Sequence, residues 1–350
     1  MIRGTIWHII SNRWFSAISS YCLQASRALE LEGFENIVTP LEGSPVHGKA
    51  LDYGMDVRPV TSFNILNTPL FKKYERAIKP SYIFLYGGPE TTIAKFFSRE
   101  VRLVRFRGRD NDGKQNKWLL RLAHTHIDEV IVPSEGFRRF FEPSLPCPVR
   151  AIPYGADECS YLTSIAHGEG RPTLTVVGRL DPIKGHREFF SYFREVLDAW
   201  SGGQAPFLRI IGKEANLKVV DLEEAAARAN LAVTNYEIIP ELVPDITSIM
   251  VKTSLGVVCS LGSEVICRVG AEFLLNGTPI AVTDVGSLGE LLFEDAGVCY
   301  SQMSPRDFAS FLQRCHSEKV EIRLSRQRRA TELFSTKAMG AHLKKLVSIS

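Results

Sequence analysis

The feature that most constrains the fold is a repeated alternation of short apolar runs with longer amphipathic stretches along the 350 residues. In the first half, β-branched and aromatic residues concentrate in candidate strands at residues 5–10, 81–86, 101–106 and 129–132. Residues 16–31 carry apolar side chains at helical spacing and are followed by Gly33, a typical helix-end residue. This alternation predicts a Rossmann-like parallel sheet covered by helices.

The same rhythm starts again in the second half of the chain. Candidate strands lie at residues 173–177, 207–211, 232–239, 255–260 and 279–283. The segment 153–171 between the two halves is rich in Gly, Ser and other turn-forming residues, so we interpret it as the linker. A chain of 350 residues fits two domains, which we place at 1–155 and 156–335.

Charge and cysteine usage exclude several classes of function. A net charge of +3 is too small to indicate general nucleic-acid binding. The seven cysteines form no Cys-x-x-Cys pair, which argues against a disulfide framework and a zinc site and favours a cytoplasmic protein. We expect neither a secretory leader nor a membrane-spanning segment. The absence of Gly-x-Gly-x-x-Gly and of a Walker loop disfavours a dinucleotide oxidoreductase or an ATPase.

The strongest local motif lies at residues 177–186, where a strand runs into a loop shaped by Gly and Pro that opens a helix. Ligands of open α/β sheets bind outside the carboxyl ends of the strands, and a helix N-terminus there favours phosphate. Gly178 lies in this motif, and Arg179 and Lys184 are candidates to clamp a diphosphate and stabilise its growing charge. Alternatively, both cations are solvated loop residues.

A second motif combines two carboxylates seven residues apart with a helical segment. Glu264 follows the strand 255–260, and Glu272 lies about two helical turns further on. Carboxylates accept hydrogen bonds from sugar hydroxyls, so one is suited to a ribose and the other to a transferred sugar. Alternatively, Glu264 is a helix N-terminal acid and Glu272 an exposed helix residue.

The ordered motifs, together with 277–281 and Gly286, resemble the C-terminal half of family 4 retaining glycosyltransferases over residues 173–335. The first half is similar, less tightly, in the helix from Ser16, in Tyr86-Gly87-Gly88-Pro89, in 130–134 and in 152–157. The resemblance implies an α/β GT-B fold with two Rossmann-like domains facing a central cleft, and a last segment, 336–350, that packs back toward the first domain.

The resemblance also implies roles for individual residues. Arg179 and Lys184 would bind the donor diphosphate, Glu272 the ribose, and Glu264 with nearby backbone amides the donor sugar. The implied catalytic residues are Glu264, Arg179 and Lys184. The implied donor-binding residues are Gly178, Arg179, Lys184, Glu264, Val265, Ile266, Cys267, Arg268 and Glu272. No metal and no cofactor are expected beyond the nucleotide-sugar donor, for which UDP- or GDP-sugars are the first expectation.

The chain departs from the family pattern at three places. The usual Gly-Gly before the first helix is replaced by Arg13-Trp14-Phe15-Ser16-Ala17, and Glu-Gly-Phe-Gly by Glu264-Val265-Ile266-Cys267. Where many members carry His-Gly, this chain has Arg107-Gly108-Arg109. Candidates on the acceptor or phosphate side are Ser16, Gly87, Arg107 and Arg109, and none of them is an evident catalytic base.

A basic cluster runs from Arg99 to Arg121 in the half expected to receive the acceptor. It suggests an anionic, lipid-linked or phosphorylated acceptor or an anionic membrane surface, unless it is an ordinary solvated face. Asp110-Asn111-Asp112 matches a metal-binding string, but we interpret it as a solvated turn. We interpret His124 and His126 as capping or packing residues rather than catalytic ones.

These patterns predict a retaining glycosyltransferase that uses a nucleotide diphosphate sugar and a glycan or lipid-linked acceptor. We expect it to act in cell-envelope polysaccharide or lipopolysaccharide synthesis, in the cytoplasm or peripherally on the inner face of the membrane. Two alternatives remain open: a catalytically silent nucleotide-sugar-binding partner, and a nucleotide-sugar epimerase or hydrolase.

Overall fold

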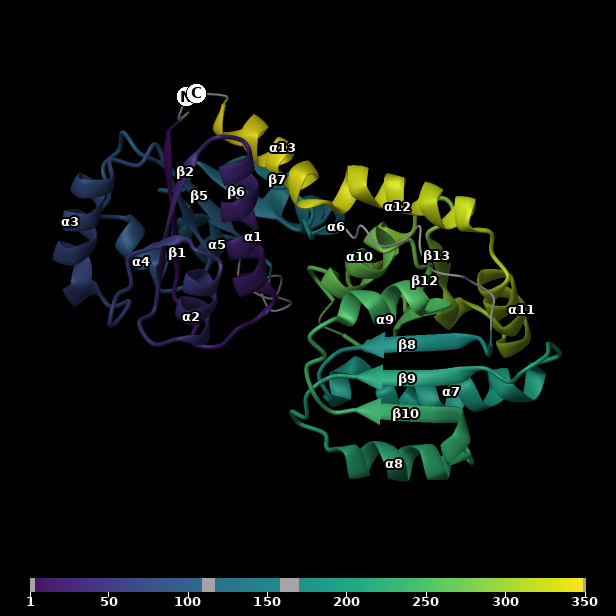
Figure 1. The fold of residues 1–350 in the computed structure, drawn as a ribbon. Helices are drawn as coiled ribbons and strands as arrows, with labels where there is room; N and C mark the ends of the chain where they lie inside the picture. Colours follow the sequence, from purple (N-terminus) through teal and green to yellow (C-terminus); the bar gives the residue numbers. More distant parts are fainter. Residues whose placement is uncertain (1–3, 109–116, 158–169, 263, 349–350) are drawn as a thin grey trace. The chain divides into compact units, whose positions relative to one another are not determined.

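The computed structural model describes residues 4–108, 117–157, 170–262 and 264–348 (Figure 1). The chain divides into two compact units. The N-terminal unit comprises Met1–Gly155 and Leu333–Ser350, and the C-terminal unit comprises Ala156–Glu332. Each unit is built around one parallel sheet.

The described part of the N-terminal unit forms a seven-stranded sheet in the order β3-β2-β1-β4-β5-β6-β7. Its strands are β1 (Thr5–Ile10), β2 (Glu35–Pro40), β3 (Asp56–Val57), β4 (Tyr82–Leu85), β5 (Arg102–Phe106), β6 (Glu129–Val132) and β7 (Val149–Ala151). Neighbouring strands pair in parallel, so their carboxyl ends meet at one edge of the sheet. We call this edge the N-terminal carboxyl edge.

Helices cover both faces of this sheet. They are α1 (Ala17–Leu31), α2 (Pro45–Asp52), α3 (Thr68–Ile78), α4 (Glu90–Ala94), α5 (Lys117–Ala123), α6 (Glu135–Phe141) and α13 (Thr336–Val347). One face packs Trp7 of β1 against Phe71 of α3, with ring centroids 6.2 Å apart. On the other face, Tyr21 of α1 stacks on Phe106 of β5 at 4.2 Å.

The chain returns to the N-terminal unit through α13, which packs along α1. Gly340 permits a close approach, because a Cβ at this position would lie 2.6 Å from the carbonyl oxygen of Ala28. Lys344 Nζ donates to Glu32 Oε2 at 2.7 Å and ties the two helices together near the end of α1. Residues more than 300 positions apart in sequence therefore form one face of the same unit.

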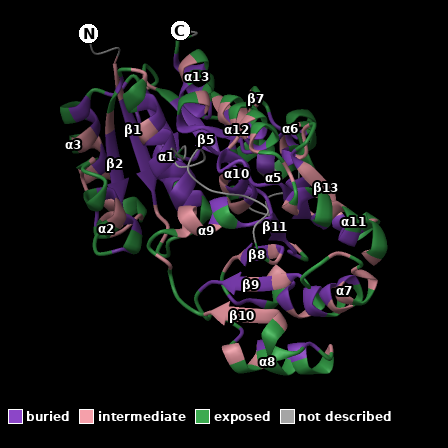
Figure 2. Ribbon diagram, turned by 45° about the vertical axis from the view of Figure 1, so that its right-hand side comes forward, coloured by how far each residue is buried: buried purple, intermediate pink, exposed green. Residues whose placement is uncertain are grey.

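The described part of the C-terminal unit contains a six-stranded parallel sheet in the order β10-β9-β8-β11-β12-β13. Its strands are β8 (Thr173–Val177), β9 (Phe207–Ile211), β10 (Tyr236–Ile239), β11 (Leu255–Val258), β12 (Ile280–Val282) and β13 (Gly297–Cys299). The central strands are rich in Val, Ile and Leu and are buried, whereas the edge strand β10 is half-buried (Figure 2).

The helices of the C-terminal unit are α7 (His186–Ala199), α8 (Val219–Arg228), α9 (Ile246–Lys252), α10 (Arg268–Leu275), α11 (Pro305–His316) and α12 (Val320–Phe334), the last of which runs across the boundary at residue 332. The apolar stripe of α7, with Phe189, Phe193 and Val196, lies in the core against the sheet. The spacing of these side chains in the sequence predicts this packing.

The predicted architecture of two Rossmann-like layers is confirmed, while several element boundaries differ. Residues 233–235, expected as the start of a strand, form a 3₁₀ turn before β10. The last part of the chain forms two helices, α12 and α13, because the side chain of Ser335 accepts from the backbone N–H of Ala338 and caps a new helix. Much of the linker expected at 153–171 lies outside the described residues.

Helix α12 is anchored in the C-terminal unit by a buried arginine. Arg323 is 1% exposed and donates to the carbonyl oxygens of Thr253 and Val251 at 3.2 and 2.9 Å. It also donates to Thr278 Oγ1 at 2.7 Å, within the Gly-Thr-Pro segment that precedes β12. Burial lowers the pKa of Arg323 to about 10, so the guanidinium is charged at neutral pH.

We predict that Arg323→Ala destabilises the protein by about 3 kcal/mol or more, because two buried carbonyl groups and a hydroxyl lose their donor. Urea denaturation measures this change. Arg328→Ala, on the exposed side of the same helix, is the matched control and should change the free energy of unfolding by about 0.5 kcal/mol or less. Equal effects of the two substitutions would contradict the anchoring role.

Candidate active site

The first predicted motif forms a tight turn at the carboxyl end of β8. Arg179 leaves the strand with its side chain 62% exposed, and its Nη2 lies 3.4 Å from Asp181 Oδ2. The buried carboxylate of Asp181 accepts from the backbone N–H of Ile183 at 3.1 Å and from Asn216 Nδ2 at 2.9 Å. Asp181 therefore fixes the turn that carries Lys184, while Arg179 is held by one long ion pair.

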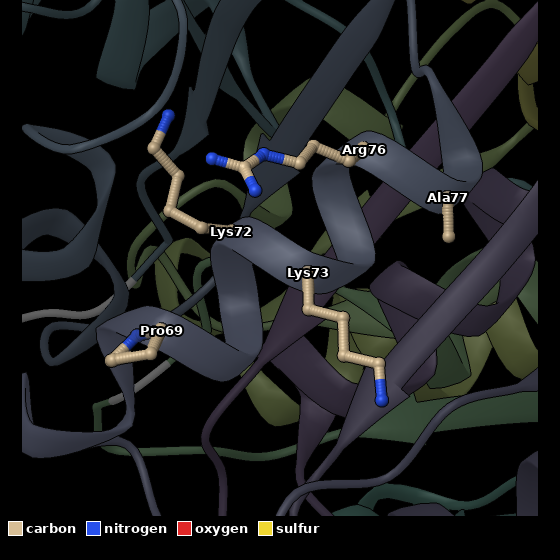
Figure 3. Close-up of a pocket in the computed structure, with 5 residues that line it drawn as sticks. All are labelled: Pro69, Lys72, Lys73, Arg76 and Ala77. Carbon is tan, nitrogen blue, oxygen red and sulfur yellow. The ribbon is translucent and has the colours of Figure 1, made fainter.

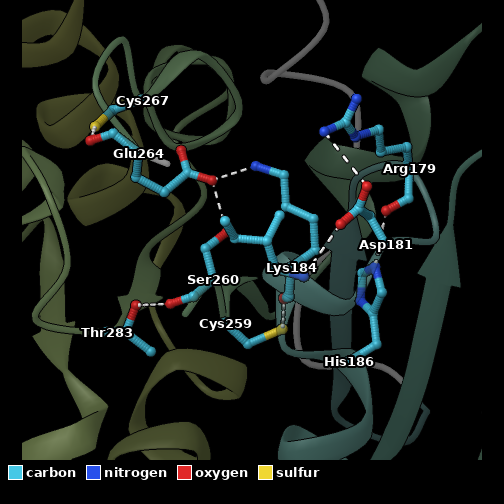
Figure 4. A network of polar contacts seen from close by, with 10 residues as sticks. Arg179, Asp181, Lys184, His186, Cys259, Ser260, Glu264, Cys267 and Thr283 are labelled. Carbon is cyan, nitrogen blue, oxygen red and sulfur yellow. Dashed lines mark hydrogen bonds and ion pairs between the residues drawn. The ribbon is translucent and has the colours of Figure 1, made fainter. Parts of the chain in front are cut away.

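The second motif meets the first through a partly buried ion pair (Figure 4). Lys184 Nζ contacts Glu264 Oε1, and Ser260 Oγ donates to the same carboxylate oxygen at 2.6 Å. The side chains of Lys184 and Glu264 are 25% and 10% exposed. Because β8 and β11 are parallel neighbours, the loops that follow them meet at one edge of the sheet, the C-terminal carboxyl edge.

The loop that carries Glu264 is held by its backbone as well. The carbonyl oxygen of Glu264 accepts from the N–H of Ser287 at 2.8 Å and from Cys267 Sγ at 3.4 Å. Gly286 has a φ of +60°, and a Cβ there would lie 2.2 Å from that carbonyl oxygen. Thr283 Oγ1 donates to the carbonyl oxygen of Ser260 at 2.6 Å. Segments after β11 and β12 thus jointly fix the carboxylate.

The remaining predicted donor-binding residues lie on or just before α10. Arg268 Nε donates to Glu272 Oε1 at 2.7 Å, one helical turn along, and these side chains are 43% and 22% exposed. The side chains of Val265, Ile266 and Cys267 are buried, so a contact with a ligand would involve their backbone groups. No side chain among the described residues caps the N-terminus of α10.

Two buried groups behind Lys184 were not predicted from sequence. His186 is 1% exposed, and its Nε2 lies 3.2 Å from the carbonyl oxygen of Arg179, while burial lowers its pKa and keeps the ring neutral. Cys259 Sγ donates to the carbonyl oxygen of Lys184 at 3.2 Å, and burial raises the pKa of this thiol to about 12. Both side chains thus contact backbone carbonyl groups of the turn that carries Lys184 (Figure 4).

In the N-terminal unit, the carboxyl edge carries a buried carboxylate that was also missed. Glu90 is 1% exposed and accepts from the backbone N–H of Ser11, and from Ser11 Oγ at 2.9 Å. Burial raises the pKa of Glu90. The predicted residue Gly87 explains how the carboxylate fits, since a Cβ there would lie 2.4–2.6 Å from Ser11 Oγ and both Glu90 oxygens. Ser16 acts as the N-cap of α1.

The basic cluster from Arg99 to Arg121 is not one surface, which corrects the sequence-based expectation. Arg99, Arg102 and Arg121 are exposed, whereas Arg105 and Arg107 are 7% and 4% exposed. The guanidinium of Arg107 lies 5.4 Å from the centre of the Phe141 ring. Arg109, Lys114 and the Asp110–Asp112 string lie outside the described residues.

His124, which the sequence suggested as a capping or packing residue, is buried beside these arginines. Its Nδ1 lies 2.7 Å from the carbonyl oxygen of Leu120, one turn earlier. Burial and the charge of Arg105 lower the pKa of His124 to about 4. The ring is therefore neutral at physiological pH.

Over residues 4–108, 117–157, 170–262 and 264–348, no group of three or more His, Cys, Asp or Glu side chains is arranged to hold a metal ion. In the same described ranges, no helix has the length and apolar character needed to cross a membrane.

Part of the chain matches a known protein family. Residues 171–318 match the family described as "Glycosyl transferases group 1". No curated protein sequence matches the chain. The chain is similar to the solved structure of HepE from Anabaena in complex with UDP and glucose, with 14% identity, a TM-score of 0.74 and coverage of 99% of this chain and 100% of that one.

Two other solved structures have the same fold. A glycosyltransferase from Rickettsia africae is 12% identical, with a TM-score of 0.78 and coverage of 99% of this chain and 98% of that one. The lipopolysaccharide outer core galactosyltransferase WaaB, in its apo form, is 11% identical, with a TM-score of 0.70 and coverage of 98% and 99%.

The fold and the family match define a glycosyltransferase of the GT-B type, as the sequence predicts. The Lys184–Glu264 pair lies within residues 171–318, the part of the C-terminal unit that matches the group 1 glycosyltransferase family. The two sheets correspond to the two Rossmann-like domains of GT-B enzymes.

We predict that Gly87→Ala destabilises the N-terminal unit by about 1–3 kcal/mol, because the added methyl group displaces Glu90 or Ser11 from their buried contact. Chemical denaturation followed by tryptophan fluorescence measures the loss. Gly88→Ala is the matched control, because a Cβ at Gly88 has no neighbour within 4 Å. If both variants were equally stable, the close packing around Glu90 would not depend on Gly87.

Proposed function

We propose that this protein is a retaining, family 4 glycosyltransferase that moves a sugar from a UDP- or GDP-sugar to a glycan or lipid-linked acceptor. We further propose that it serves cell-envelope polysaccharide or lipopolysaccharide synthesis at the cytoplasmic face of a membrane. The main support for this proposal is the contact between Lys184 and Glu264, which joins the two sequence motifs within the residues that match the group 1 glycosyltransferase family. UDP in the HepE complexes supports the nucleotide, and WaaB supports the envelope role.

In this proposal the C-terminal unit binds the donor and the N-terminal unit receives the acceptor. Arg179 is largely exposed and held by one long ion pair, so it can turn toward a diphosphate with little loss. Lys184 faces the same edge and already lies next to a carboxylate, so a diphosphate would share its positive charge. The uncapped N-terminus of α10 supplies backbone N–H groups and a favourable dipole for the same anion.

The two carboxylates have complementary tasks in the proposed mechanism. Glu264 is fixed by Ser260 and Lys184 and presents its carboxylate to hydroxyl groups of the donor sugar. Glu272 is partly exposed on α10, where its carboxylate would accept hydrogen bonds from the ribose while Arg268 Nε donates to its Oε1. As the bond to the sugar breaks, Arg179 and Lys184 stabilise the charge that develops on the leaving diphosphate.

We predict that Arg179→Ala and Lys184→Ala each weaken UDP binding by about 1.5–3 kcal/mol, roughly ten- to hundredfold, because each removes a charge-assisted hydrogen bond to phosphate. Titration calorimetry with UDP measures this loss, and uridine binding should change far less. Arg194→Ala is the control, since this exposed cation on α7 pairs with Asp198. Unchanged UDP affinity in both site variants would remove Arg179 and Lys184 from the site.

We also predict that the reaction retains the anomeric configuration. In a same-face reaction the departing phosphate, with its charge spread by Arg179 and Lys184, takes the proton of the acceptor hydroxyl, so no separate carboxylate base is required. Once the donor and acceptor are identified, NMR of the first product measures the anomeric proton coupling. An inverted linkage would overturn this mechanism.

The same assays separate the two alternative functions. Donor consumption that needs no acceptor would indicate an epimerase or hydrolase. UDP-sugar binding without turnover by the isolated protein would indicate a catalytically silent partner, an alternative suggested by Arg13–Ala17 in place of Gly-Gly.

A further inference from the structure

Helix α3 in the N-terminal unit carries a strongly basic outer face. Its buried side packs Phe71 and Ile78 into the core. Lys72, Lys73 and Arg76, at spacings of three and four residues, lie on the other side with Pro69 and Ala77 (Figure 3). Figure 3 shows Lys72 and Arg76 extending to one side of the helix and Lys73 to the other. The three cations thus spread over the width of this face.

No exposed carboxylate balances these charges on the helix itself, all of whose residues are described. Glu75, the acidic residue of α3, is 7% exposed. Its carboxylate accepts from the backbone N–H of Ser98 at 2.6 Å and from Lys72 Nζ at 2.8 Å. Lys73 and Arg76 are exposed. The outer face of α3 therefore carries an excess of positive charge in its C-terminal half, although Lys72 is paired with Glu75.

The positive surface continues past the end of the helix. Lys79, with a φ of +51°, ends α3, and an open groove of about 750 Å³ follows there. Lys72, Arg76, Lys79 and Arg102 line this groove together with two carboxylates, the exposed Glu100 and Glu75, which pairs with Lys72. Since β4 and β5 begin here, this groove lies at the amino edge of the sheet, away from the carboxyl edge that holds Ser11 and Glu90.

The other end of α3 is apolar. The 3₁₀ turn Ile65–Asn67 leads directly into the helix. Ile65 and Leu66 are 54% and 81% exposed, although large apolar side chains are usually covered. Asn67 Nδ2 donates to Ser62 at 2.8 and 2.9 Å and fixes this turn. Exposed aliphatic side chains thus lie directly before the helix whose outer side carries the cations.

We propose that the outer face of α3, with Ile65 and Leu66, is a docking surface for an anionic lipid membrane. A helix that lies in a membrane interface combines cations, which attract anionic headgroups, with apolar side chains, which enter the acyl boundary. A soluble phosphate would use only the cations and would leave Ile65 and Leu66 in water. This inference deepens the proposed function, which places the enzyme at a membrane, by assigning the residues that touch it.

Vesicle co-sedimentation of the full chain, without donor or acceptor, tests the proposal. Each cation near an anionic surface contributes about fivefold to binding, or about 1 kcal/mol. We expect Lys73→Ala/Arg76→Ala to reduce partitioning onto phosphatidylglycerol–phosphatidylcholine vesicles about 25-fold, and Lys79→Ala/Arg102→Ala to reduce it in the same direction. Lys337→Ala/Lys345→Ala on α13 is the matched control, which removes the same charge from the opposite face of the unit.

Salt and lipid composition separate the two parts of the surface. Binding should fall steeply between 0.15 and 1 M salt, over which the Debye length shrinks from about 8 to about 3 Å. Leu66→Ala should weaken binding at both salt concentrations, because its contribution is apolar. Phosphatidylcholine vesicles should bind poorly.

Three results would overturn the proposal: no binding to anionic vesicles, equal binding by the α3 and α13 variants, or a stronger preference for a single-stranded oligonucleotide than for the vesicles. Because UDP binding is measured separately, failure of the membrane test leaves the transferase assignment intact. Failure of UDP binding leaves the lipid measurement equally interpretable.

Discussion

The partly buried contact between Lys184 and Glu264 is the interaction on which the candidate active site depends. The two residues are 80 positions apart and follow different strands, so the contact exists only when β8 and β11 pair in parallel. Either charge alone in this partly dehydrated position would be unfavourable, which makes each loop dependent on the other. Asp181 holds the lysine turn, and the backbone of Ser287 holds the glutamate loop. The site is thus preformed at the C-terminal carboxyl edge.

Sequence patterns predicted most of the interior strands of both sheets, because these strands lie in apolar runs between turn signals, and they also predicted the edge strand β10. The edge strands β3, β7 and β13 and the interior strand β2 were missed for physical reasons. β3 has two residues and β13 has three, too few to display any period. β7 is equally short, and its Arg150 breaks the apolar run. β2, at Glu35–Pro40, opens with two polar residues and contains a proline, which disguises a central parallel strand.

Sequence motifs nominate the residues of the candidate site but not the contacts between them. The motif order placed Arg179, Lys184, Glu264 and Glu272, while their pairing as Lys184–Glu264 and Arg268–Glu272 requires the tertiary structure. The number of arginines in a segment also does not tell which of them are exposed, and here Arg105 and Arg107 are buried. Glu90 resembles an ordinary acid at the start of a helix until Ser11, 79 residues away, is seen to donate to it.

In the N-terminal unit, the polar groups at the carboxyl edge are separate from the cations of α3, an arrangement that suits the proposed docking on a membrane. Ser11 and Glu90 lie at the carboxyl edge, whereas the cations of α3 lie along one face of the sheet. Since α3 lies between β3 and β4, which are parallel strands of one sheet, it runs back along the sheet from the carboxyl edge to the amino edge. A membrane bound along α3 would therefore lie alongside the strands rather than across their ends. Under the proposed docking, the membrane lies along α3 and leaves the carboxyl edge of the N-terminal unit uncovered.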